Sequence, residues 1–170
     1  MKVIFWKDPS TFFSKLICWW TKQRYFHTEL LFSDGQIFSA SPNIKRTKFF
    51  TYNPLSSQPR DIFELNVSEE EEAVIRKFCE GELGCRYDFV GIVFSMVFPF
   101  QFQHPHWWFC SEVSLAALQK IGMFPGVKPH TVDPGEFFTK VITSGKVIQP
   151  KLEMKKYTPR SFEKAILGSK

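Results

Sequence analysis

The sequence has few cysteines, and no two of them form a Cys-x-x-Cys pair. Its 170 residues contain four, namely Cys18, Cys79, Cys85 and Cys110. This spacing does not match the usual cysteine zinc sites, and we find no signal peptide that would favour a disulfide framework. We therefore expect reduced thiols in a cytoplasmic setting, where an individual cysteine can be reactive. Cys18, Cys79 and Cys85 are most simply packing residues.

Long apolar runs are also lacking. The longest covers residues 89–102, and its 14 residues include Pro99. A helix needs about 20 apolar residues to cross a bilayer, so we expect no transmembrane segment. The run fits better as a buried or interfacial helix that is capped by Asp88 and ends near Phe98.

Acidic residues are scarce at the C-terminal end. Residues 146–170 hold seven Lys and Arg against two Glu, whereas residues 1–145 carry 15 charges of each sign. The net charge of +5 therefore belongs to the tail, and a nucleic-acid-binding core is not indicated. We expect one domain over residues 1–145 and a basic extension over residues 146–170. The extension is solvated or docks on a partner, with RNA, phosphate or a membrane surface as the less favoured contact.

Apolar and aromatic residues are abundant. The sequence is 44% hydrophobic and contains 20 Phe and 5 Trp, which fits one globular domain with a sizeable core. Periodicity predicts strands over residues 2–6, 24–32, 36–41 and 61–67, with a polar loop between the last two. Cap signals predict helices after Asp8, Ser68, Asp88 and Asp133, and over residues 110–122. The first helix has an apolar stripe that we expect to pack on the sheet, formed by Phe12, Phe13, Leu16, Ile17 and Trp20.

The strand over residues 24–32 carries a histidine and an acid two positions apart. Alternate residues of a strand face the same side, so His27 and Glu29 project together. Asp34-Gly35 is a two-residue hairpin signal, and it brings the chain back as the strand over residues 36–41. A half-exposed strand edge would also explain this pattern, so the choice between a structural and a functional role depends on the rest of the chain.

Cys110 begins a segment with the composition of a helix that stops at Gly122. At the first turn of a helix, unpaired N–H groups and the dipole favour a thiolate, and they could also hold an oxyanion. Together with His27 and Glu29, this cysteine supplies the parts of a cysteine hydrolase. Papain-like enzymes place the cysteine before the histidine, so the order found here requires a circular permutation or an unrelated fold.

Three blocks carry a resemblance to a known family. They are RYFHTELLFSDG, CRYDFVGI and WWFCSEVSLAAL, and they span residues 24 to 118 in this order. Together they resemble the permuted papain-like branch of the NlpC superfamily, the YaeF/YiiX-like group. The resemblance implies an α+β fold with an antiparallel sheet packed against helices that include the cysteine-bearing helix. CWWTKQRYFHTEL, residues 18–30, is also similar to proteins of tailed phages and prophages.

Carried onto this chain, the resemblance implies Cys110 as the nucleophile, His27 as general base and then acid, and Glu29 as the group that orients the imidazole. The alternatives for this third group are a water, Ser39 and Ser41. The residues expected near the site as substrate-binding or oxyanion groups are Tyr87, Trp108 and Ser111. No cofactor is needed.

The predicted function is a peptidase- or amidase-type cysteine hydrolase that cleaves an amide through an acyl-enzyme on Cys110. The resemblance implies a peptidoglycan peptide, another peptide-like amide or an N-acyl or lipid group as substrate. One alternative is a catalytically idle phage virion or tail module whose basic tail binds virion proteins. Another is a zinc-binding module through His104, His106 and Cys110. A phage origin would favour a virion location over a cytoplasmic one.

Overall fold

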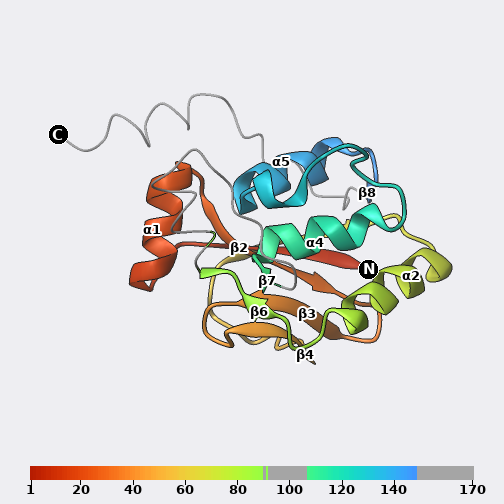
Figure 1. The fold of residues 1–170 in the computed structure, drawn as a ribbon, viewed down its shortest axis with the longest axis horizontal. Helices are drawn as coiled ribbons and strands as arrows, with labels where there is room; N and C mark the ends of the chain where they lie inside the picture. The colour runs from red at the N-terminus through yellow and green to blue at the C-terminus, as the bar shows by residue number, and fades with distance from the viewer. Residues whose placement is uncertain (90, 92–106, 149–170) are drawn as a thin grey trace.

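The computed structural model describes residues 1–89, 91 and 107–148 (Figure 1). The strands are β1 (Lys2–Lys7), β2 (Tyr25–Leu31), β3 (Gln36–Ser41), β4 (Arg46–Thr51), β5 (Arg60–Leu65), β6 (Arg86–Tyr87), β7 (Trp107–Trp108) and β8 (Val147–Ile148). The helices are α1 (Phe12–Thr21), α2 (Glu69–Gly81), α4 (Cys110–Gln119) and α5 (Pro134–Thr143), with a 3-10 turn η1 (Pro129–Thr131) before α5.

The strands form one eight-stranded sheet in the order β7-β6-β4-β3-β2-β1-β5-β8. All neighbours run antiparallel except β6 and β7, which are parallel. The fold is therefore α+β as expected, but the prediction of an antiparallel sheet is wrong at this edge. A parallel pair needs a crossover connection, and the chain between Tyr87 and Trp107 is long enough to make one.

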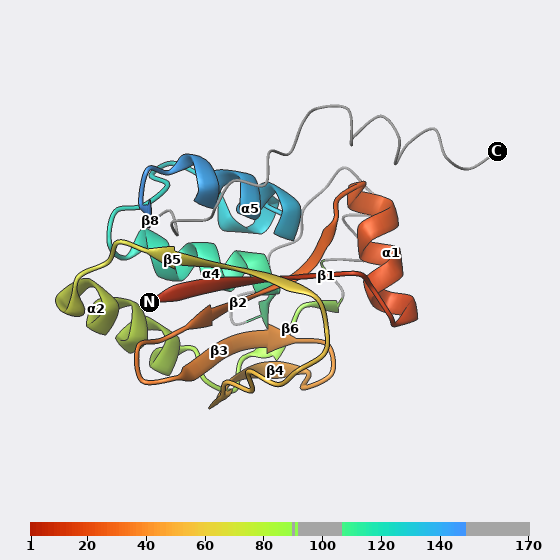
Figure 2. The ribbon, with the colours of Figure 1, turned by 180° about the vertical axis from the view of Figure 1, so that it is seen from behind.

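The helices cover one face of the sheet and its two ends. Helices α4 and α5 lie side by side over one face, whereas α1 and α2 stand at opposite ends, as both views show (Figures 1 and 2). The main core fills the space between this face and the helices, and its buried members include Val3, Phe5, Leu30, Phe38, Val113, Leu118 and Phe137. A smaller cluster on the other face contains Ile4, Leu31 and Ile37, with Trp6 packed against it.

The hairpin that follows β2 is confirmed, but its loop is longer than two residues. The Phe32 N–H donates to the Gln36 carbonyl at 2.8 Å, which leaves residues 33–35 in the loop. Gly35 adopts a φ of +82°, a conformation that suits glycine and is typical of a three-residue hairpin loop.

Helix α1 begins three residues later than the Asp8-Pro9 signal predicted. Thr11 is the N-cap, because its hydroxyl accepts the Ser14 N–H at 3.2 Å and the Ser14 hydroxyl accepts the Thr11 N–H at 3.0 Å. Ile17 is buried against the sheet, as expected. Phe12 and Trp20 are not, since they are 83% and 36% exposed. The predicted inward stripe is therefore wrong at its two ends.

One strand falls where we predicted a polar loop. Strand β4 alternates outward Arg46 and Lys48 with buried Thr47, and it pairs along the whole of β3. We missed this strand because its outward residues are basic, so the alternation of buried and exposed positions did not appear as an alternation of apolar and polar residues. The cap predictions at Ser68 for α2 and at Asp133 for α5 are both confirmed.

Part of the prediction falls outside the described residues. The Asp88 carboxylate accepts the Gly91 N–H at 2.6 Å, as an N-cap would, but residues 92–98 of the expected helix are not described. Strand β8, at the start of the expected extension, pairs with β5, and residues 149–170 are not described. No helix in the described ranges is long and apolar enough to cross a membrane.

Candidate active site

Cys110 is the first residue of α4, as the sequence predicted. The preceding residue, Phe109, is extended and serves as the N-cap, and its N–H donates to the Glu112 carboxylate at 3.2 Å. The Cys110 side chain is fully buried. Amides in the first turn of a helix have no acceptor within the helix, so this end of α4 favours negative charge.

His27 and Glu29 lie on the same side of β2, also as predicted. His27 Nε2 is 3.2 Å from Glu29 Oε1 and 3.0 Å from the Ser39 hydroxyl of β3. Two of the candidates for the third polar group, Glu29 and Ser39, therefore meet the same nitrogen. The side chain of Ser41, the other candidate, instead accepts the Asn43 N–H at 3.4 Å.

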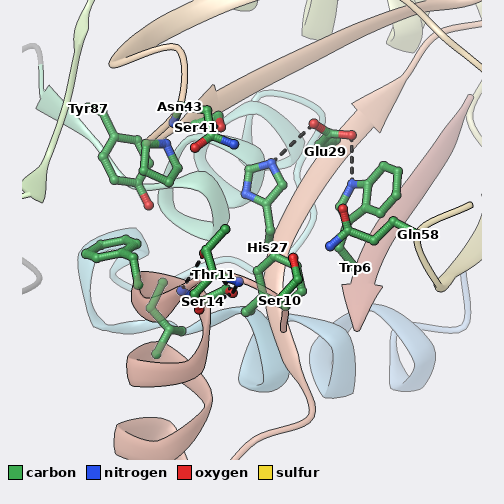
Figure 3. Close-up of a pocket in the computed structure, with 14 residues that line it drawn as sticks. Trp6, Ser10, Thr11, Ser14, His27, Glu29, Ser41, Asn43, Gln58 and Tyr87 are labelled. Atoms are coloured by element: carbon green, nitrogen blue, oxygen red, sulfur yellow. Dashed lines mark hydrogen bonds and ion pairs between the residues drawn. The ribbon is translucent and has the colours of Figure 1, made fainter. Parts of the chain in front are cut away.

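The second oxygen of Glu29 is held by a residue that the sequence analysis missed. The Trp6 indole N–H donates to Glu29 Oε2 at 2.8 Å (Figure 3). Burial alone would raise the pKa of Glu29, but hydrogen bonds from His27, Trp6 and Ser39 outweigh it and lower the pKa below its ordinary value. The carboxylate is therefore ionised. The pairing of β1 with β2 could have indicated this contact, because it places Trp6 opposite His27.

Cys110 reaches His27 beyond the paired part of β2 and β3. Among the described residues, β2 pairs with β3 at Leu30 and Leu31 and the pairing stops before His27. Helix α4 contacts both strands from the main-core side, whereas His27 shares its side of β2 with Leu31 of the smaller cluster. The backbone pairing of the two strands thus ends before His27, and the start of α4 lies close enough for Cys110 to interact with the imidazole.

The two groups interact strongly. Burial alone would lower the pKa of His27, but the charge of Cys110, a hydrogen bond to Cys110 and the Glu29 carboxylate together raise it to about 10. The imidazole is therefore positively charged at neutral pH. Because its Nε2–H faces Glu29, Nδ1 is the nitrogen left to exchange a proton with the thiol.

A cavity of about 250 Å³ opens beside His27 and Glu29, whereas Cys110 is fully buried and is not among the described lining residues (Figure 3). Its lining includes His27, Glu29 and Tyr87 together with apolar Phe13 and Ile17 of α1. Figure 3 shows the His27 ring and the Tyr87 hydroxyl directed into the same space. Burial, followed by the charges of Cys110 and Asp88, raises the pKa of Tyr87 well above its ordinary value, so its hydroxyl stays protonated and can donate a hydrogen bond.

Two other predicted site residues have structural partners instead. The Trp108 indole donates to Glu82 at 2.8 Å and its ring packs edge-on against Phe78 of α2. Ser111 is fully buried and its hydroxyl donates to the Val132 carbonyl at 2.5 Å. Neither belongs to the cavity lining among the described residues.

The remaining cysteines lack this environment. All four cysteines are free. Burial raises the pKa of Cys18, Cys79 and Cys85, with that of Cys85 reaching about 11. These three are therefore protonated thiols at neutral pH.

The histidines of the zinc alternative, His104 and His106, lie outside the described residues. Within the described ranges no cluster of His, Cys, Asp and Glu side chains could hold a metal ion. Searches with the sequence find no matching protein-family model and no significant match among curated proteins.

Proposed function

We propose that this chain is a thiol hydrolase of the peptidase or amidase type. The observation that carries the proposal is the placement of Cys110, at the start of a helix, against His27, whose Nε2 is held by Glu29. In such an arrangement the cysteine is the nucleophile and the histidine carries its proton. The acid holds the histidine in the correct tautomer. A buried structural cysteine needs neither of the other two.

The residues suggest the following mechanism. The Cys110 thiolate attacks the amide carbonyl carbon, and N–H groups in the first turn of α4 receive the developing oxyanion. His27 gives its proton to the leaving amine, which leaves an acyl group on Cys110. A water then attacks this thioester, His27 takes the water's proton, and the acid is released as the thiolate is restored. The Tyr87 hydroxyl is placed to bind the substrate carbonyl or the oxyanion.

We also propose a circularly permuted papain-like fold for this domain. The proposal is supported by the three blocks that resemble the NlpC superfamily and by the chain order, in which His27 and Glu29 on a strand precede Cys110 on a helix. The substrate that we favour is a peptide-like or N-acyl amide. Its acyl part would enter the cavity beside Phe13 and Ile17.

The test is the pH dependence of alkylation by iodoacetamide, followed for each cysteine by peptide mass spectrometry. Because Cys110 is buried, the shape of its profile matters more than its absolute rate. In the wild type the rate at about pH 6.5 is expected to lie within about threefold of that at pH 9. In His27→Ala the rate should instead rise steeply with pH over this range, since no imidazolium is left to stabilise the thiolate.

Cys85 is the internal reference for this experiment. It is half-buried, and its labelling should rise with pH equally in both proteins unless His27→Ala disturbs the fold. If Cys110 in the wild type follows the profile of an ordinary thiol, or if His27→Ala leaves its profile unchanged, the proposal is wrong.

A further inference from the structure

Helix α1 exposes large apolar side chains that do not pack in the described part of the fold. Phe12 is 83% exposed and Trp19 is 76% exposed, and Trp20 beside them is 36% exposed. Phe12 and Trp19 are seven residues apart, or about two helical turns, and therefore lie on the same side of α1. Large exposed apolar patches mark interaction surfaces, and several big aromatic side chains on one side of a helix are candidates for one. We call Phe12, Trp19 and Trp20 the aromatic face of α1.

The helix is anchored without this face. Ser14 and Ile17 are its buried residues, and Phe13 packs against the main core. Polar residues at positions 12 and 19 would therefore leave the inward contacts unchanged. Within the described part of the chain these rings have no structural task, so a contact with a partner explains the aromatic face best.

Basic residues border the aromatic face. Lys15 lies between Phe12 and Trp19 on the helix and is exposed, as is Lys22 at the C-terminal end. The first turn of α1 contains no acid. Arg24 follows, also exposed, and Asp8 is the nearest exposed acid in the sequence before the helix. The surroundings of the aromatic face are therefore net positive.

This combination favours one kind of partner. Tryptophan and phenylalanine flanked by lysine suit the boundary between lipid headgroups and acyl chains, because the rings enter the apolar layer while the ammonium groups stay with anionic headgroups. A protein partner of the same face would need to supply both an apolar groove and a ring of acids. We propose that α1 docks this protein on the surface of an anionic lipid bilayer.

The inner side of the same helix lines the candidate active site. Thr11, Phe13, Ser14 and Ile17 contribute to the cavity that also holds His27 (Figure 3). Helix α1 is thus the wall between the aromatic face and the cavity. Docking through α1 would place the cavity at the bilayer surface, although binding itself does not depend on the chemistry of Cys110.

The test is sedimentation of the full chain with vesicles of phosphatidylcholine that contain about one third phosphatidylglycerol, compared with pure phosphatidylcholine. The wild type should bind the anionic vesicles. Phe12→Ser combined with Trp19→Ser should weaken binding about tenfold or more, because both rings lose the apolar layer. Lys15→Glu should weaken it by about fivefold or more, the contribution of one basic residue near a charged surface.

Matched controls separate this surface from general stickiness and from the basic tail. Leu55→Ser removes an apolar side chain that is 89% exposed, and Lys48→Glu reverses an exposed charge on β4, so neither should alter binding. Cys110→Ser should bind like the wild type, which keeps this test independent of the hydrolase proposal.

Three results would overturn the inference. The first is failure of the wild type to bind anionic vesicles. The second is binding that persists in the double variant Phe12→Ser/Trp19→Ser, which would assign it to another part of the chain such as residues 149–170. The third is a concentration-dependent dimer that the same double variant abolishes while vesicles are ignored, which would make the partner a second copy.

Discussion

Glu29 uses both of its oxygens within the protein, and each has a different task. Oε1 lies 3.2 Å from the His27 ring and Oε2 accepts the Trp6 indole N–H at 2.8 Å. Trp6 is held in turn by the Arg60 guanidinium, which stacks at 5.1 Å from its ring centroid. Trp6 is therefore a positioning residue, which acts on the histidine through the carboxylate.

Replacing Trp6 with phenylalanine tests this role. Trp6→Phe keeps a ring under Arg60 but leaves Glu29 one donor short in a buried setting, so the pKa of Glu29 should rise. We expect the free energy of unfolding to fall by about 1 to 3 kcal/mol. Alkylation of Cys110 near neutral pH should slow several-fold, because the imidazole is less firmly oriented.

Trp108→Phe is the matched control. It removes an indole hydrogen bond of the same length, to Glu82, away from the cavity. It should lower stability while leaving the pH profile of Cys110 alkylation unchanged. Equal effects of the two variants on that profile would argue against a positioning role for Trp6.

At the scale of elements, the start of α4 is fixed by Ser111, for which the sequence predicted a different role. Ser111 was expected near substrate, but its hydroxyl ties α4 to Val132, just after η1. The position of Cys110 in the first turn was predictable, since composition and the Gly122 stop define the helix. The partner of Ser111 was not, because it depends on how the chain after α4 folds back.

Ser111→Ala separates the two roles. The loss of a fully buried hydroxyl donor leaves the Val132 carbonyl unsatisfied, so the free energy of unfolding should fall by about 1 to 2 kcal/mol. The alkylation profile of Cys110 should stay as in the wild type. Ser144→Ala removes a similar bond at the half-buried end of α5 and should cost less. If Ser111→Ala leaves the free energy of unfolding unchanged but alters the pH profile of Cys110 alkylation, the result would instead favour a role for Ser111 in the site.

Local sequence signals predicted the boundaries of elements well where a helix cap or a hairpin turn sets the boundary. Ser68, Asp133 and Asp34-Gly35 each mark a boundary through their own side chain or backbone preference, and each is confirmed. The start of α1 was misplaced because Asp8-Pro9 resembles a cap signal, whereas Thr11 and Ser14 bind each other's backbone. Strand β4 was missed because its outward residues are basic.

At the scale of the molecule, the site depends on features that no local pattern contains. The sequence predicts that His27 and Glu29 share a side of β2, but not that the backbone pairing of β2 with β3 ends before His27. Nor does it predict that α1 turns Phe12 outward, since hydrophobic spacing alone cannot distinguish a core face from a docking face. Both depend on the relative placement of whole elements, which is decided by packing.

The charge state of His27 is the most direct test of the proposed Cys110–His27 pair. It is measured by following the ring resonances of His27 by NMR against pH in the wild type and in Cys110→Ser, where a neutral hydroxyl replaces the thiol. The account predicts that wild-type His27 remains an imidazolium through neutral pH, with a pKa of about 10, and that Cys110→Ser lowers this pKa. Titration of His27 near its ordinary value of about 6.5 in both proteins would contradict it.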